Sequence, residues 1–256
     1  MTKLVKILLI ILLSILVIGT TIFFVNVLKN NSFSFITRES TNIVFKEEYD
    51  DVFTDIAINS KFGNIIVNQI DEKKVTVEIY GEKDKVKVDA EYNTLFIETD
   101  MDGCTFFCFN RTISKVIINL PKDYAYNLAI NDNYGNITVG QFDNMILKAS
   151  LNAGDINVKS VKRIKVDNNF GDIDIGRVNE YMMVDESFGN ITIGEVTLND
   201  NSSVENSFGN ITIGRTNEIK INAKTSLGKA KIHNNNEDSY IILNIKNSFG
   251  NIIVNN

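Results

Sequence analysis

The pair Cys104 and Cys108, in the stretch DGCTFFCFN, is the most distinctive group of reactive side chains in the sequence. Two nearby thiols can form a disulfide, bind a metal or act as nucleophiles. A zinc site needs a second pair of ligands and a catalytic thiol needs a base, and the sequence shows neither beside this pair. If the chain lies outside the cytoplasm, a disulfide that fixes the local loop is the favoured interpretation.

Three phenylalanines share this loop with the cysteines: Phe106, Phe107 and Phe109. Apolar side chains at an exposed loop tip mark a contact with a partner or a membrane. We therefore name them a candidate interaction loop. The alternative, which the sequence leaves open, is that the three rings fold back and cover one end of the domain.

The remaining candidates for chemistry are few. His233 is the only histidine, and it lies in the polar stretch KIHNNNED, which is typical of a solvated turn. Asp155, Asp172 and Asp174 occur in GDI contexts, but calcium-binding nonapeptide repeats need a much shorter glycine and aspartate period. The sequence thus predicts a non-enzymatic protein with no catalytic residues, no metal site and no cofactor.

Residues 4–28 form an apolar run whose only charge is Lys6. At 1.5 Å per residue a helix of this length would measure about 37 Å, which exceeds a hydrocarbon core of about 30 Å. Lys3 and Lys6 place residues 1–3 in the cytosol and the bulk of the chain outside. A cleaved signal peptide is the alternative, although the run exceeds the usual apolar core of about 7–15 residues. We predict a single-pass anchor in the cell membrane.

The charge balance argues against nucleic acid as a partner. The chain has a net charge of −6, and residues 1–29 contain only basic charges, at Lys3, Lys6 and Lys29. The extracytoplasmic part is therefore more negative than the whole. Such a surface repels phosphate backbones and anionic headgroups. We expect membrane contact through the N-terminal helix and no binding of nucleic acid.

A short word with a central glycine recurs along the chain: SFGNITIG occupies 187–194 and again 207–214. Related words place the glycine at eight positions: Gly63, Gly135, Gly154, Gly171, Gly189, Gly209, Gly228 and Gly250. From Gly135 on, the spacing is about 19 residues, which is in the range of solenoid repeats. One such unit cannot bury its apolar face alone, so identical words indicate units that stack on one another.

The parity of the apolar residues predicts how each unit bends. Ile164 and Val166 precede Gly171 at even positions, whereas Ile173 and Ile175 follow it at odd positions. Side chains alternate between the two faces of a strand, so both pairs point inward only if an extra residue turns the chain between them. Each unit is therefore predicted to be two short strands around a glycine corner.

Stacking would align three columns of side chains. We expect the aromatic residue before each glycine and the isoleucine two positions after it to lie in the core. We expect the polar residue two positions before the aromatic one to cap the corner or form a hydrogen-bonded ladder, with a polar groove as the alternative. The aromatic column is Phe62, Tyr134, Phe170, Phe188, Phe208 and Phe249; the isoleucine column is Ile137, Ile156, Ile173, Ile191, Ile211 and Ile252; the polar column is Ser60, Asp132, Asn168, Glu186, Asn206, Thr225 and Asn247.

The repeat word is absent between Gly63 and Gly135. Residues 71–121 instead alternate apolar and polar side chains in several short runs, a pattern typical of hairpin or meander strands. We assign residues 53–256 to the repeat domain, with 71–121 as its hairpin region. Residues 29–52 are assigned to a juxtamembrane segment.

Together these features resemble a known family. An N-terminal span, the strand pair INLPKDYAYNLAIND and glycine-cornered repeats of the form G-[ND]-I-x-[VI] resemble the bacterial cell-envelope β-strand repeat family of putative adhesins, also called the toastrack domain. The resemblance covers about residues 53–256. It implies a right-handed β-solenoid-like stack on the cell envelope, in some members tied to envelope-stress signalling, and no catalytic residues.

The sequence ends its repeats in NIIVNN with no capping unit after it. An open edge invites strand addition, so residues 245–256 are predicted to bind an envelope protein or a second copy. The function expected is that of a membrane-anchored, extracytoplasmic interaction or scaffold protein in adhesion or envelope-stress regulation. The alternative is a glycan-binding or carbohydrate-active β-helix, which a groove lined with acids would favour.

Overall fold

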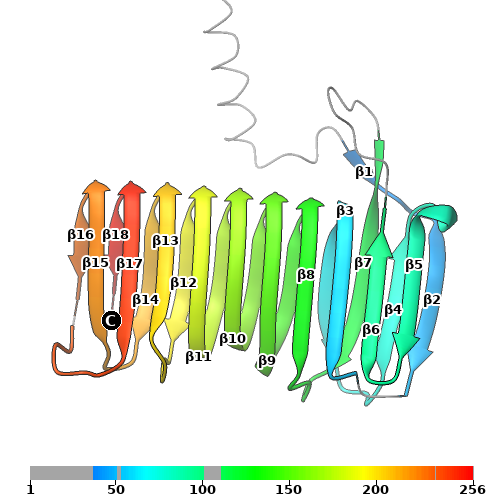
Figure 1. Cartoon of the computed structure of the whole chain (residues 1–256), viewed down its shortest axis with the longest axis horizontal. Coiled ribbons are helices and arrows are strands. Elements are labelled where there is room, and N and C mark those ends of the chain that lie inside the picture. The colour runs from blue at the N-terminus through cyan, green and yellow to red at the C-terminus, as the bar shows by residue number, and fades with distance from the viewer. Residues whose placement is uncertain (1–36, 51–52, 101–110, 234, 256) are drawn as a thin grey trace, which may run out of the picture.

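The computed structural model describes residues 37–50, 53–100, 111–233 and 235–255, and this part of the chain is all-β (Figure 1). Strands lie side by side along the long axis in one continuous, mostly parallel arrangement. The predicted all-β class and solenoid-like stacking are confirmed at this level. The handedness of the stack stays a prediction from the family resemblance.

The first strands are β1 (Thr37–Glu39), β2 (Ile43–Tyr49), β3 (Asp55–Ile70), β4 (Val75–Tyr80), β5 (Val86–Glu91), β6 (Thr94–Thr99) and β7 (Arg111–Pro121), with the 3-10 turn η2 (Lys83–Lys85) before β5. The later strands are β8 (Asn127–Tyr134), β9 (Ile137–Ala153), β10 (Ile156–Phe170), β11 (Ile173–Phe188), β12 (Ile191–Val196), β13 (Ser202–Phe208), β14 (Ile211–Thr216), β15 (Lys220–Leu227), β16 (Ala230–Ile232), β17 (Ile242–Phe249) and β18 (Ile252–Val254).

The repeated words stack in register, which explains their identity. In β10 and β11, Ile156 pairs with Ile173 and Phe170 pairs with Phe188. The first half of each coil pairs in one layer and the second half in another, so the stack has the near and far layers visible in Figure 1. Equivalent residues of successive coils therefore touch, and a residue that suits one coil suits the next.

Glycine is required where the chain passes from one layer to the other. Six of the eight predicted corner glycines have φ between 136° and 158°, a region that L side chains rarely adopt. A Cβ at Gly171 would also lie 1.9 Å from the carbonyl oxygen of Gly154 in the neighbouring coil. Both the turn and the close stacking of coils depend on the missing side chain.

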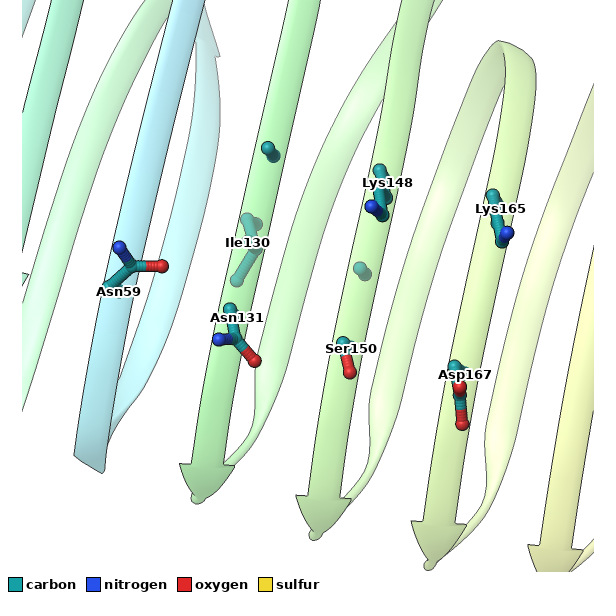
Figure 2. Close-up of a pocket in the computed structure, with 9 residues that line it drawn as sticks. Asn59, Ile130, Asn131, Lys148, Ser150, Lys165 and Asp167 are labelled. Carbon is teal, nitrogen blue, oxygen red and sulfur yellow. The ribbon is translucent and has the colours of Figure 1, made fainter.

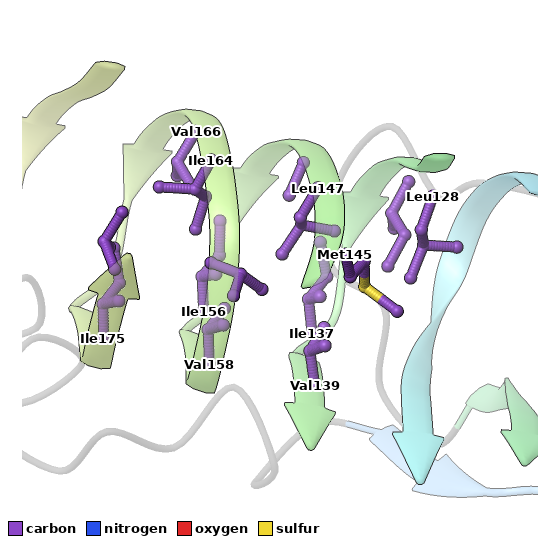
Figure 3. Close-up of a cluster of buried hydrophobic side chains, with 14 of the residues drawn as sticks. Leu128, Ile137, Val139, Met145, Leu147, Ile156, Val158, Ile164, Val166 and Ile175 are labelled. Carbon is purple, nitrogen blue, oxygen red and sulfur yellow. The ribbon is translucent and has the colours of Figure 1, made fainter. Parts of the chain in front are cut away.

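The core lies between the two layers, and Figure 3 shows its columns of aliphatic side chains. All six residues of the predicted isoleucine column are buried, at 0–1% exposure. Burial of one such side chain contributes about 1.5–3 kcal/mol. Because every coil adds the same small set of residues, the core grows along the stack and has no single centre.

The predicted position of the aromatic column is wrong. The rings lie on the outside of the stack, where Phe188 is 41% exposed and Phe170 is 47% exposed. The inward position nearest the corner belongs to the polar residue, Asn168 in the coil of Phe170, and the strand turns away after it. The rings stack instead on one another: the Phe188 and Phe208 centroids are 4.8 Å apart with planes 2° apart.

The sheet begins before residue 53, because β1 and β2 already belong to it. β2 pairs antiparallel with β4, and β4 pairs antiparallel with β7. β5 and β6 form an antiparallel hairpin, and β6 joins the stack by pairing parallel with β3. The region 71–121 thus contains the antiparallel strands that its alternating pattern predicted, and β2 and β5 form edges at this end.

The order of the last coils differs from the order of the sequence. β17 lies between β13 and β15, and β18 lies between β14 and β16. The predicted open edge at residues 245–256 is therefore wrong, because strands cover both sides of that coil. The edge at this end of the stack belongs to β15 and β16, as Figure 1 shows at its left.

The predicted membrane span at residues 4–28 lies outside the described residues. Within the described ranges, no helix has the length and apolar character needed to cross a membrane.

Candidate functional site

Side chains of the polar column form hydrogen bonds to the backbone at the corners, which is the capping role predicted for them. Asn206 donates from Nδ2 to the carbonyl oxygen of Gly189 at 2.9 Å, and Asn247 does the same to Gly209 at 2.8 Å. The Asn206 side chain also accepts a hydrogen bond from the backbone N–H of Phe208 at 3.2 Å. These bonds satisfy backbone groups that the turn leaves without a strand partner.

Two members of this column are buried carboxyl groups, Asp132 and Glu186. Burial raises the pKa of each to about 8, so both are largely protonated at neutral pH. Glu186 accepts from the N–H of Phe188 at 2.9 Å, while its Oε2 and the Oδ1 of Asn168 both lack a donor. Protonation removes the charge that burial disfavours on Glu186. Both carboxyls thus belong to the scaffold and not to a solvent-facing site.

A second ladder follows each corner glycine. Asp155 accepts the backbone N–H of Asp172 at 2.9 Å, and Asp172 accepts that of Asn190 at 2.7 Å. The same bond runs from coil to coil through Asn136, Asn190 and Asn210. Asp155 and Asp172 are therefore hydrogen-bonded to neighbouring coils. In the described part of the chain, no group of three or more His, Cys, Asp and Glu side chains could hold a metal ion.

A shallow groove crosses the outer face of the near layer, where Figure 2 shows the side chains of β3, β8, β9 and β10. One row across it contains Asn59, Asn131, Ser150 and Asp167, which are consecutive partners in the sheet register. Ala129, Lys148 and Lys165 form a second row in the same register. We call this surface the polar groove. It is formed by outward residues and is different from the groove considered above for the inward polar column.

The first row continues beyond the groove as three acids. Asp167 pairs in register with Asp185, and Asp185 pairs with Glu205. Partial burial and the neighbouring charges of Glu205 and Asp167 raise the pKa of Asp185. Lys246 ends this acid row with an ion pair to Glu205 at 2.7 Å. These acids and Lys246 line a second shallow hollow.

Both surfaces are suited to binding. They present amides, hydroxyls, ammonium groups and carboxylates at the strand spacing of about 4.8 Å, on a rigid sheet. Neither surface was predicted from the sequence, because the regular signal of the repeat lies in its inward residues and both surfaces are formed by outward residues. Aligning the outward residues at equivalent positions of consecutive coils would have predicted these rows.

Of the candidate residues named from the sequence, the structure describes His233, which does not line either surface. His233 is exposed in a turn beside β16, with its backbone N–H bonded to Val254 at 2.9 Å. The cysteine pair and the candidate interaction loop, Cys104, Cys108, Phe106, Phe107 and Phe109, lie outside the described residues. Their disulfide and their contact role stay predictions.

Solved structures of low identity resemble the chain along most of its length. A "putative cell adhesion protein" from Clostridium sporogenes has 13% identity and a TM-score of 0.36, covering 82% of this chain and 98% of its own. A "putative adhesin" from Bacteroides fragilis has 17% identity and a TM-score of 0.39, and the match covers 86% of this chain and 99% of its own. A "putative lipid binding protein" from Parabacteroides distasonis has 13% identity and a TM-score of 0.41, and the match covers 85% of this chain and 99% of its own.

These TM-scores are low, so no argument rests on them. A comparison with curated proteins finds no match. The sequence model of one family matches residues 53–254, which is most of the chain and includes the corner glycines, the buried ladders and both outer surfaces. The chain therefore belongs to the Toastrack DUF4097 family.

Proposed function

We propose that the protein is a non-enzymatic interaction or scaffold protein, anchored in the cell membrane by residues 4–28 and displaying its β-stack outside the cytoplasm. Its role would be adhesion or envelope-stress regulation. The observation that supports this best is the outer face of the near layer, where the polar groove and the acid row run across seven consecutive coil positions from Asn59 to Lys246. A flat, rigid and chemically varied face of this kind fits the surface of another macromolecule.

Rigidity is the reason to favour binding at this face. Each row is fixed by parallel backbone pairing, so its side chains need little ordering when a partner binds. Lys148 and Lys165 offer donors next to the acceptors of Asp167 and Asn131. A partner that carries both acidic and amide groups would satisfy this arrangement.

Photo-crosslinking in intact cells tests the proposal. A photoreactive phenylalanine analogue at Asn131, which is exposed in the polar groove, should capture an envelope protein that mass spectrometry can identify. The matched control places the same analogue at Asn157, which is exposed on the far layer of the stack. Capture at both positions alike, or at neither, would remove the polar groove as the binding face.

The anchor is tested separately. Protease added to cells stripped of their wall should degrade the β-stack, while the full-length chain should stay in the membrane fraction after alkaline washing. Release of an intact domain into the medium would show that the N-terminal run is cleaved and would overturn the anchoring part of the proposal.

A glycan-binding or carbohydrate-active function is the second candidate, and the acid row is the observation that favours it. Asp167, Asp185 and Glu205 line one hollow, and carboxylates bind sugar hydroxyls and serve as general acids. The stacked rings give less support, because the inner rings of the stack turn their faces toward each other. Asp185→Asn should abolish glycan capture or release of sugar products if this candidate is correct; both activities unchanged in the variant would exclude the acid row as their source.

A further inference from the structure

The coil formed by β17 and β18 is inserted between two coils that precede it in the sequence. In the near layer Val204 pairs with Ile245, and Ile245 pairs with Ala223. In the far layer Ile213 pairs with Val254, and Val254 pairs with Ile232. We call residues 242–254 the inserted coil. Its two neighbours, residues 202–216 and 220–232, form a slot that is built from earlier chain.

The inserted coil fills this slot on both sides and at every level. Its four inward aliphatic residues are fully buried: Leu243, Ile245, Ile252 and Val254. On one side Asn247 donates to the carbonyl oxygen of Gly209 at 2.8 Å, and Phe249 stacks on Phe208 at 4.7 Å. On the other side Thr225 donates to the carbonyl oxygen of Gly250 at 3.0 Å. The slot is therefore complete only when a coil of this sequence occupies it.

The link to the inserted coil contacts the edge strand β15 through polar groups: Asn235 Oδ1 accepts the backbone N–H of Ile221 at 2.7 Å, and Lys220 forms an ion pair with Glu237 at 3.1 Å. Residues 233–241 connect β16 to β17, and their described side chains are mostly exposed, Tyr240 at 95%. Nine residues can extend to about 30 Å. The coil of β3 is likewise flanked by two coils that are consecutive in the sequence, β6–β7 and β8–β9. The inserted coil differs from it because both of its neighbours precede it in the chain.

We propose that the inserted coil exchanges between two copies of the chain, so that residues 242–254 of each copy fill the slot of the other. An exchanged coil makes the same backbone pairs, the same buried contacts and the same glycine bonds as the resident one. The exchange therefore costs mainly the entropy of association. It links two copies without using an open sheet edge, and it does not depend on the proposed binding role of the polar groove.

Cysteine pairs across the slot test the exchange in the full-length chain. Ser203 and Asn244 are register partners on β13 and β17 and point outward, and the spacing of adjacent strands suits a disulfide. Two chains with different tags, one Ser203→Cys and the other Asn244→Cys, are co-expressed with Cys104 and Cys108 changed to serine. Exchange should join the two tags in one disulfide-linked dimer.

The matched control uses a pair that exchange leaves within one copy. Met183 and Ser203 are register partners on β11 and β13. Met183→Cys in one chain with Ser203→Cys in the other should give several-fold less mixed dimer than the slot pair. Equal amounts of mixed dimer in the two mixtures, or none in either, would overturn the exchange.

A single chain carrying both Ser203→Cys and Asn244→Cys reports on the slot itself. It should form a disulfide within the chain or, when exchanged, a dimer with two such bonds. Neither product in a chain that is otherwise folded and oxidised would show that residues 242–254 do not occupy the slot, and the proposal would then fail with its premise.

Discussion

At the residue scale, the polar column contains asparagines that bond the neighbouring coil and two carboxyl groups that replace them. Asn168, Asn206 and Asn247 each donate to a glycine carbonyl of a neighbouring coil that precedes them in the sequence. Asp132 and Glu186 occupy the same column with a carboxyl group, which has a donor only while it is protonated. The column makes the stability of the stack depend on pH.

Glu186→Gln should remove part of this dependence. The pKa of Glu186 rises from 4.5 in the unfolded chain to about 8 in the folded one, because the side chain is buried. Its contribution is therefore fully present below the lower value and is lost as pH rises toward the upper one, at up to about 1.4 kcal/mol per pH unit. Glutamine keeps a donor at every pH, so the variant should match the parent near pH 5 and exceed it at pH 8.

Urea unfolding of both chains at these two pH values measures the difference. Glu218→Gln is the control, because Glu218 is exposed in the link before β15 and its loss should not give the variant this pH-dependent gain. If the free energy of unfolding of the Glu186→Gln variant fell with pH as steeply as that of the parent, Glu186 would be ionised in the folded state.

Glycine at the corner is tested by Gly171→Ala. The substitution places a Cβ on a backbone with φ of 137° and 1.9 Å from the carbonyl oxygen of Gly154, so the two coils must separate. We expect a loss of about 3 kcal/mol or more in the free energy of unfolding. Gly140→Ala is the matched control, since its nearest contact would be 3.3 Å and its φ is not in the forbidden region. Equal losses in the two variants would contradict the role of the corner.

At the element scale, the sequence predicted the corner and the buried isoleucines but not the direction of the aromatic residues. Parity places Phe170 on the same side as Ile164 and Val166, and the rule holds through Asn168. It fails at the last position because the strand turns there to begin the corner. Periodicity describes only the straight part of a strand, so a residue next to a turn needs the turn geometry before its direction can be predicted.

The exposed rings still stabilise the stack. Phe188 stacks on Phe170 at 5.0 Å and on Phe208 at 4.8 Å, with nearly parallel planes. Each such pair contributes about 0.5–1.5 kcal/mol beyond its buried area. Phe188→Ala should therefore cost about 1–3 kcal/mol, and Phe188→Leu should recover only the apolar part. Thermal unfolding of the two variants measures this, and identical midpoints for both would show that the ring geometry contributes nothing.

At the scale of the whole molecule, the repeat predicted a stack but not the order of its coils. All coils share the same corner, so each could in principle follow any other. The observed order places SFGNIIV beside SFGNITI, where Phe249 extends the ring stack and Asn247 extends the amide column. The less similar coil SLGKAKI then lies at the end. The polar groove was not predicted either, because it is formed by outward residues that differ from coil to coil.

The end coil carries exposed lysines at Lys224, Lys229 and Lys231, although the chain as a whole is acidic. Lysines on an edge strand oppose the addition of another strand, because pairing would bury or crowd their charges. This coil is therefore a cap, and its position explains why the best-matched coil lies inside the stack. An end without these charges should behave as an open edge.

Lys224→Thr combined with Lys231→Thr tests the cap. The double variant should associate end to end, with a mass in light scattering that grows with protein concentration, while its unfolding midpoint changes little. Lys159→Thr, on the exposed face of the far layer, is the control and should leave the mass unchanged. Association through the end needs no exchange of the inserted coil, so the Ser203 and Asn244 cysteine pair should crosslink no more in this variant than in the parent. A double variant whose mass stays independent of concentration would show that the lysines are not what keeps this edge closed.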